Sequence, residues 1–252
     1  HSLRPKGQKV KLIYPGYVLS DADGRYLSCE LSWEGMKTET NSMTSQKVGR
    51  LLDEKLAKEL CRLWNISPIT TRWVCVEKDP TNVRMRLVAR EIAKGQLSAR
   101  DLMASSPTSS IESLRLMLSK ASANDLVIFG LDVSAAFMAS PLGQKLGKPI
   151  KVILRMPSNI TFPDGSPVFM EAYKAINGLR SSGLAWVEHL ANLLQSLKIS
   201  PSPLESTIFA GEVTIRKGQK PEWIQVVAYV DDLLVFAKSA MFVFDYLSKS
   251  LK

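Results

Sequence analysis

The chain has 252 residues, and 45% of them are apolar, which is enough to bury a core and argues against a disordered segment. Its 33 Lys and Arg against 24 Asp and Glu give a net charge of +9, which makes nucleic acid the leading candidate for a partner. The 3 cysteines form no disulfide framework or zinc motif, and no apolar run is long enough to span a bilayer, so we expect an intracellular protein with no membrane partner.

Residues 1–44 are expected to form short strands and turns, and we assign this segment no function. From Ser45 onward the apolar residues recur with a helical period. One face would carry Val48, Leu52, Leu56, Leu60 and Trp64. This pattern predicts a helix that leads into the next region.

Two strands follow, "TRWVCVE" and "VRMRLVAR", joined by the turn "KDPTN". In the second strand a period of two separates basic from apolar side chains. The basic face would carry Arg84, Arg86 and Arg90, and the apolar face Met85, Leu87 and Ala89. The cationic face has two interpretations, a solvated outer surface or a surface that grips phosphates.

The rest of the chain predicts helices and antiparallel strands. Ser109 and Glu112 have the spacing of a capping box at the start of one helix, and "LAWVEHLANLLQSLK" predicts another with Trp186 on its inner face. An apolar strand ends at Asp132, and a meander follows as "STIFAGEVTIR", "WIQVVAYV" and "LLVFAK", with "DD" as the last turn. The expected fold class is α+β, with helices on one face of an antiparallel sheet.

An aspartate stands at the end of an apolar strand twice, at Asp132 and at Asp231 with Asp232. If the two strands are neighbours, the carboxylates converge at one edge of the sheet. Two carboxylates about 4 Å apart repel by about 4 kcal/mol at a dielectric constant near 20, so one binds a proton or a cation lies between them. Magnesium and phosphoryl transfer fit such a cluster. The alternative is a structural or interaction domain in which "DD" is only an acidic surface turn.

Taken in order, these segments resemble the reverse transcriptase domain of Ty1/copia-type retrotransposons, a family of RNA-dependent DNA polymerases. "TRWVCVEKD" with "RMRLVAR" is similar to its fingers motif, "LDVSAAFM" to its LDVxxAF motif, "AINGLRSSGLAW" to its "YGLKQxxxxW" motif and "AYVDDLLVFA" to its YVDD box. The resemblance covers roughly residues 46–245. It implies a fingers and palm fold, with an antiparallel palm sheet that has helices packed on one face.

The resemblance also implies a division into three regions. Residues 1–44 would be an extension of unknown role, residues 45–107 a fingers-like region with a leading helix, and residues 108–252 a palm-like catalytic region. The chain stops about twenty residues after Asp232, so we expect it to lack the primer grip and the thumb.

The family's roles carry over to positions of this chain. Asp132 and Asp231 would be the shared metal ligands, the carbonyl of Val133 would complete the site, and Asp232 would be the third catalytic carboxylate. Tyr229 would approach the primer end, with template and primer contacts also from Arg90 and Arg180.

The nucleotide contacts implied by the resemblance come from other motifs. Lys78 and Arg84 would clamp the triphosphate, with Arg86 in support, and Phe137 would block a ribose 2′-hydroxyl. Asn177 and Gly178 would lie against the nucleotide and the template base. The alternative for Phe137 is an ordinary core residue, and for Arg90 a structural ion-pair partner.

Three positions depart from the family's motifs. Glu91 stands in place of a Gly, Asn177 in place of a Tyr and Ser181 in place of a Gln, which bears on the template and nucleotide contacts.

The implied reaction is template-directed attack of a primer 3′-hydroxyl on the α-phosphate of a deoxynucleoside triphosphate, with magnesium, or manganese in its place. The implied partners are an RNA or DNA template with its primer and the rest of a retrotransposon polyprotein, which includes integrase, thumb and ribonuclease H. The implied location is a cytoplasmic particle or the nucleus. The alternative function is a degenerate retroelement remnant that binds nucleic acid without polymerising.

Overall fold

The computed structural model describes residues 10–91, 108–145, 148–214, 218, 220–240, 243 and 247. Its contacts divide the chain into two compact units. Unit 1 comprises His1–Ser98 and Phe137–Ser182, and unit 2 comprises Ala99–Ala136 and Gly183–Lys252. Phe137–Ser182 thus groups with the first unit, and the division into three consecutive functional regions stays a prediction. Among the helices that the structure describes, none has the length and apolar character needed to cross a membrane.

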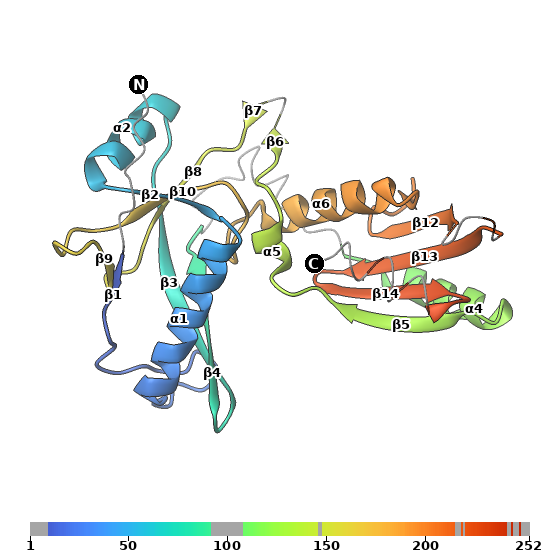
Figure 1. Ribbon diagram of the computed structural model, residues 1–252, viewed down its shortest axis with the longest axis horizontal. Helices are drawn as coiled ribbons and strands as arrows, with labels where there is room; N and C mark the ends of the chain where they lie inside the picture. The colour runs from blue at the N-terminus through green and yellow to red at the C-terminus, as the bar shows by residue number, and fades with distance from the viewer. Residues whose placement is uncertain are drawn as a thin grey trace. The chain divides into compact units, whose positions relative to one another are not determined.

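Unit 1 is built around a five-stranded sheet with the strand order β2-β10-β8-β3-β4. Its neighbouring strands are antiparallel except β3 and β8, which are parallel (Figure 1). The strands are β2 (Gly49–Leu52), β10 (Phe169–Ala172), β8 (Val152–Arg155), β3 (Ile69–Asp79) and β4 (Asn82–Ala89). The two strands predicted on either side of "KDPTN" are thus confirmed, and β4 lies at the edge of the sheet.

Helix α2 (Glu54–Trp64) begins later than the sequence predicts. Asp53 is its N-cap and accepts a hydrogen bond from the Leu56 amide at 2.8 Å, while Gly49–Leu52 before it forms strand β2. The prediction of a helix from Ser45 was wrong at this end, because residues on the expected helical stripe belong to two elements that pack together. The core that they share contains Leu52, Ala57, Ile153 and Phe169, with Leu56, Leu60 and Trp64 packed against it.

Helix α1 (Cys29–Ser45) occupies a stretch for which the sequence predicted only short strands and turns, so that prediction was wrong. The side chain of its N-cap, Ser28, accepts from the Leu31 amide, and its apolar residues Met36 and Met43 are buried. Polar residues dominate the rest of the helix, which weakens the apolar period. Packing against β4 therefore stabilises this helix more than its own pattern does.

The remaining elements of unit 1 are short. Strand β1 (Lys11–Leu12) pairs with β9 (Ile160–Thr161), and β6 (Gln144–Lys145) pairs with β7 (Lys148–Pro149). Helix α5 (Ala136–Ala139) spans the boundary between the two units.

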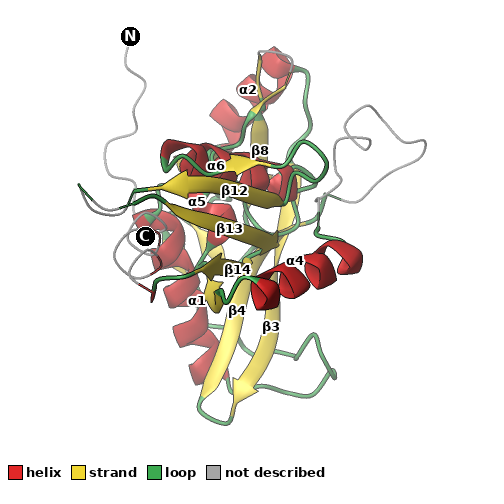
Figure 2. Cartoon of the chain, turned by 90° about the vertical axis from the view of Figure 1, so that its right-hand side faces the viewer, coloured by secondary structure: helices red, strands yellow, loops and turns green. Residues whose placement is uncertain are grey.

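Unit 2 contains a second five-stranded sheet, in the order β11-β12-β13-β14-β5, and all its neighbouring strands are antiparallel (Figures 1 and 2). The predicted meander and the strand ending at Asp132 are confirmed. The strands are β11 (Ser200–Pro201), β12 (Ile208–Val213), β13 (Glu222–Tyr229), β14 (Asp232–Ala237) and β5 (Val127–Asp132), and the helices α4 (Ile111–Ala123) and α6 (Ser182–Ser196).

Helix α4 packs through Met117 and Ala121 on Val227 and Phe236 of the sheet. Its N-cap is Ser110 rather than Ser109, so the predicted capping box was wrong by one residue. The Ser109 hydroxyl instead lies 2.9 Å from Thr207 Oγ1 and 3.1 Å from the carbonyl oxygen of Ala228. These contacts fix the start of the helix on the sheet.

Candidate active site

The carboxylates of the predicted site lie where β5 and β14 pair in unit 2. Asp132 is the direct cross-strand partner of Asp232, and Asp232 is in turn opposite Tyr229 on β13. Residues directly opposite each other in antiparallel strands have Cβ atoms about 4.5–5.5 Å apart and point to the same face. The side chains of Asp132, Asp232 and Tyr229 therefore form one row across three strands, the carboxylate row, and all three are exposed.

The hairpin turn before Asp232 consists of Val230 and Asp231 rather than of the two aspartates, which corrects the expected turn. Val230 has φ of 54°, in the left-handed region that a two-residue hairpin usually fills with Gly, Asn or Asp. A β-branched residue in this region is strained. The strain must be offset by the contacts around the turn.

Two hydrogen bonds hold the turn in this conformation. The indole N–H of Trp186 on α6 donates to the carbonyl oxygen of Val230. The Val133 amide, directly after β5, donates to the carbonyl oxygen of Asp231 at 2.9 Å. Trp186 and Val133 are both buried, so the turn is attached to the core on two sides.

The expected cluster of three carboxylates is present only in part. Asp132 is directly opposite Asp232, and in the described residues no group of three His, Cys, Asp or Glu side chains is arranged to hold a metal ion. Asp231 is half-buried in the turn. An exposed pair of carboxylates can nevertheless hold magnesium, because this ion is commonly bound through one or two carboxylates together with water and substrate phosphates.

Open space adjoins the carboxylate pair. Gly130 lies on the same face of β5 as Asp132, two residues before it. A Cβ atom added to Gly130 would have no neighbour within 4 Å. The sequence did not single out this glycine, since a strand glycine by itself gives no indication of whether its face is covered.

The basic residues predicted to bind phosphates lie on the ribbon formed by β3 and β4 in unit 1. Arg84 is exposed and Arg86 half-buried, while Met85, Leu87 and Ala89 are buried, so the predicted alternation is confirmed. Lys78 is exposed beside a register shift near the end of β3.

The segment with Asn177 and Gly178 is brought against the end of β4, also within unit 1. The Ala89 amide donates to the carbonyl oxygen of Asn177 at 2.8 Å. Gly178 has φ of 82°, and a Cβ there would lie 2.2 Å from the carbonyl oxygen of Ala89, so only glycine fits. Arg90, which follows Ala89 in the chain, is exposed.

Glu91, which stands in place of a Gly of the family's motif, has a structural role in this chain. Its Oε2 accepts a hydrogen bond from the Arg180 amide at 2.8 Å. The Ser182 hydroxyl donates to the carbonyl oxygen of Ile176 at 2.6 Å, which closes the same turn. Residues 176–182 are thereby held in place at the end of β4. Phe137 is half-buried and also belongs to unit 1.

An antiparallel sheet with an exposed carboxylate pair at a strand end is compatible with an enzyme that handles phosphates through a divalent cation. The model of the family described as reverse transcriptase (RNA-dependent DNA polymerase) matches residues 61–252. Because the match covers more than half of the chain, the chain belongs to this family. The match includes the carboxylate row, the basic ribbon and the Asn177 turn, but not α1.

Proposed function

We propose that the chain is the RNA-directed DNA polymerase segment of a Ty1/copia-type retrotransposon polyprotein, with unit 2 as the palm and the β3–β4 ribbon as part of the fingers. Membership of the family supports polymerase function in general. The observation that carries the proposal for this chain is the register that sets Asp132 opposite Asp232 at an open sheet edge.

The donor set fits magnesium, with manganese as the alternative. Asp132 and Asp232 would hold the ion, and Asp231 is the nearest further carboxylate in sequence. When bound, such an ion neutralises phosphate charge and favours the ionised form of an attacking hydroxyl. The chain itself supplies carboxylate oxygens next to a fixed turn, since hydrogen bonds from Trp186 and Val133 hold the hairpin turn in place.

Substrate binding is assigned to the basic and glycine-containing surfaces of unit 1. Lys78, Arg84 and Arg86 would bind the triphosphate of the incoming deoxynucleotide. Phe137 would exclude a ribose 2′-hydroxyl, and Asn177 and Gly178 would lie along the nucleotide and template base. Arg90, Arg180 and Tyr229 would contact template and primer.

The partners in this proposal are an RNA or DNA template with a primer and the other parts of the polyprotein, including integrase, thumb and ribonuclease H. The site of action would be a cytoplasmic particle or the nucleus. The second candidate is a remnant that binds nucleic acid without polymerising, and the net charge of +9 favours binding in either case.

Primer extension separates the two candidates. The purified chain is incubated with a DNA primer on an RNA template, deoxynucleoside triphosphates and magnesium or manganese. A polymerase extends the primer, and Asp132→Asn abolishes extension while template-primer affinity stays within about twofold. A folded chain that binds template-primer but extends nothing with either ion contradicts the polymerase and supports the remnant.

A further inference from the structure

The β3–β4 ribbon extends beyond the sheet that supports it. Strand β3 pairs with β8 only at Ile69 and Thr70, whereas its pairing with β4 continues to Asp79. Most of the ribbon is therefore two-stranded, and an isolated pair of strands is only marginally stable in water. Its two outer edges carry backbone groups that need partners.

The N-terminal segment Val18–Ser45 supplies these partners at the edge formed by β3. The Asp21 amide donates to the carbonyl oxygen of Cys75 at 2.8 Å. In return, Asp21 Oδ2 accepts from the Cys75 amide at 2.7 Å, and Oδ1 accepts from Arg72 Nη1 at 2.6 Å. Partial burial raises the pKa of Asp21, but the bonds from Arg72 and Cys75 together outweigh it, so the pKa is lowered. One residue of the segment thus satisfies both backbone groups of Cys75.

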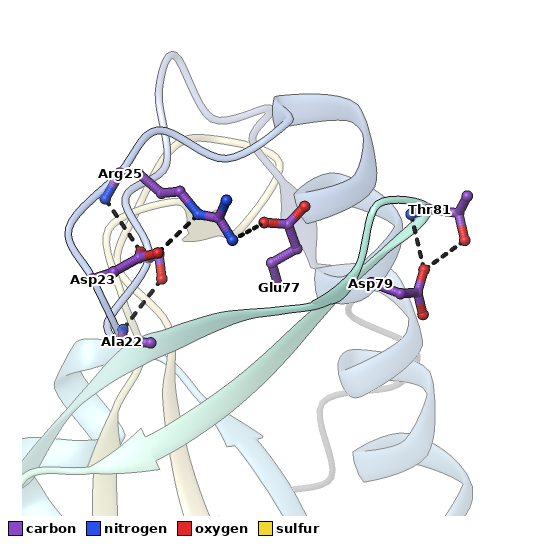
Figure 3. A network of polar contacts seen from close by, with 7 residues as sticks. Ala22, Asp23, Arg25, Glu77, Asp79 and Thr81 are labelled. Atoms are coloured by element: carbon purple, nitrogen blue, oxygen red, sulfur yellow. Dashed lines mark hydrogen bonds and ion pairs between the residues drawn. The ribbon is translucent and has the colours of Figure 1, made fainter.

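A surface ion-pair chain adds to this edge. Figure 3 shows Arg25 between Asp23, at 2.9 Å, and Glu77 of β3. In the same view Asp79 accepts from the amide and hydroxyl of Thr81, which closes the turn between the two strands. Because Arg25 is well exposed, we assign its ion pairs a minor energetic contribution.

Helix α1 supplies one such partner at the opposite edge. Glu39 Oε1 accepts from the Leu87 amide of β4 at 3.1 Å. Gly35 lets the helix approach closely, because a Cβ there would lie 2.5 Å from the carbonyl oxygen of Val83 and 2.6 Å from Met85 Cγ.

The same segment also covers the inner face of the ribbon. Val18, Leu27 and Met36 form one buried cluster with Cys75, Val83 and Met85. With the inner face and both edges covered, Arg84 and Arg86 are left on the opposite face. Burial raises the pKa of Glu39 in spite of its bond to Leu87 and the opposing influence of the Arg86 and Arg84 charges.

We infer that Val18–Ser45 is a clamp for the phosphate-binding ribbon, with Asp21 and Glu39 as positioning residues that act through the backbone of β3 and β4. The segment precedes residues 61–252, which the family model matches, so this role goes beyond the family assignment. The nucleotide-binding part of the inference rests on the proposed function.

The test compares Glu39→Ala, Glu39→Gln and the control Glu34→Ala. Glu34 lies on the same helix, is exposed and pairs with Lys37 rather than with the ribbon. The probe is a fluorescent deoxynucleoside triphosphate with magnesium. We expect Glu39→Ala to weaken its binding about tenfold with the maximal extension rate within about twofold, and Glu39→Gln to restore affinity because its amide oxygen can accept the same bond.

Hydrogen exchange of the Leu87 amide gives a readout that needs no substrate. The clamp predicts faster exchange in Glu39→Ala than in Glu34→Ala, with Glu39→Gln close to wild type. Equal exchange in all variants overturns the clamp. If exchange changes but nucleotide affinity does not, or if Glu39→Gln binds as poorly as Glu39→Ala, the positioning role is overturned. If the wild type binds no nucleotide, the proposed function fails and exchange alone decides the clamp.

Discussion

Asp132 and Asp232 are direct cross-strand partners on β5 and β14, so two like charges share one exposed position of the sheet. At about 5 Å in a water-like dielectric their repulsion costs about 1 kcal/mol. A divalent cation bound between them would convert this cost into stabilisation of the folded state.

Melting temperatures with and without magnesium measure this stabilisation. We expect Asp132→Asn to raise the melting temperature in metal-free buffer by a few degrees and to lose most of the stabilisation that magnesium gives the wild type. Asp125→Asn is the control, since Asp125 is exposed outside the carboxylate row and has φ of 50°, which Asn tolerates. Equal magnesium stabilisation in wild type and Asp132→Asn would exclude Asp132 as a ligand.

The bond from Trp186 to Val230 is expected to offset the strain of the turn. Trp186→Phe should lower the free energy of unfolding by about 2 kcal/mol, because it removes the hydrogen bond and some buried volume. Val230→Gly should raise it by about 1 kcal/mol, because glycine adopts a positive φ without strain.

Urea unfolding of both single variants and the double variant completes a cycle. The change in unfolding free energy caused by Val230→Gly is measured in the wild type and in the Trp186→Phe background. If the indole hydrogen bond and the backbone strain are coupled, the two changes differ by at least about 0.5 kcal/mol. Strict additivity would show that the Trp186 bond does not support the strained turn.

Glu91 is expected to order the turn with Asn177 and Gly178 through the Arg180 amide. Glu91→Ala should raise the KM for the nucleotide about five- to tenfold with kcat within about twofold, since a bond to a charged acceptor is lost. Glu91→Gln should stay within about twofold of wild type. An unchanged KM in Glu91→Ala, or a loss in Glu91→Gln as large as in Glu91→Ala, would contradict this role.

Glu205 should make unit 2 sensitive to acid. The Ser113 hydroxyl hydrogen-bonds its carboxylate, the Ser110 amide donates to it at 2.8 Å, and these bonds lower its pKa. A depressed pKa in the folded state stabilises the fold above the pKa of the unfolded state, near 4.3, and this stabilisation is lost as the pH falls through the folded value. Glu205→Gln should therefore melt below wild type at neutral pH, with the gap closing as the pH falls below the unfolded value and through the lowered folded one.

The control for Glu205 is Glu188→Gln on the exposed side of α6. Melting temperatures of both variants are measured from pH 7 downward. A gap for Glu205→Gln that stays constant with pH would show that the hydrogen bonds do not depend on the carboxylate charge.

Much of unit 2 could be predicted because its strands are local, apolar and separated by short turns. The period of two also assigned the two faces of β4 correctly. The register of β5 with β14 could only be a hypothesis, since their pairing joins segments about a hundred residues apart in sequence. Trp186 was predicted to lie on an inner helix face, but its bond to Val230 depends on where α6 lies against the turn.

Helix α1 was missed because its sequence is polar and its stabilising contacts come from β4. The start of α2 was missed because Leu52 and Leu56 fit one helical stripe although the first lies on a strand. The roles of Gly35, Glu39 and Glu91 depend on backbone groups of distant strands, which no local pattern encodes.

The most direct test of the proposed polymerase activity is the rate of single-nucleotide incorporation at saturating nucleotide and magnesium. On an RNA template, wild type and Asp125→Asn should incorporate the nucleotide at the same rate, and Asp232→Asn at least about a hundredfold more slowly with unchanged template-primer affinity. If Asp232→Asn retains the wild-type rate, or a folded wild type incorporates nothing, the carboxylate row is not the active site of a polymerase.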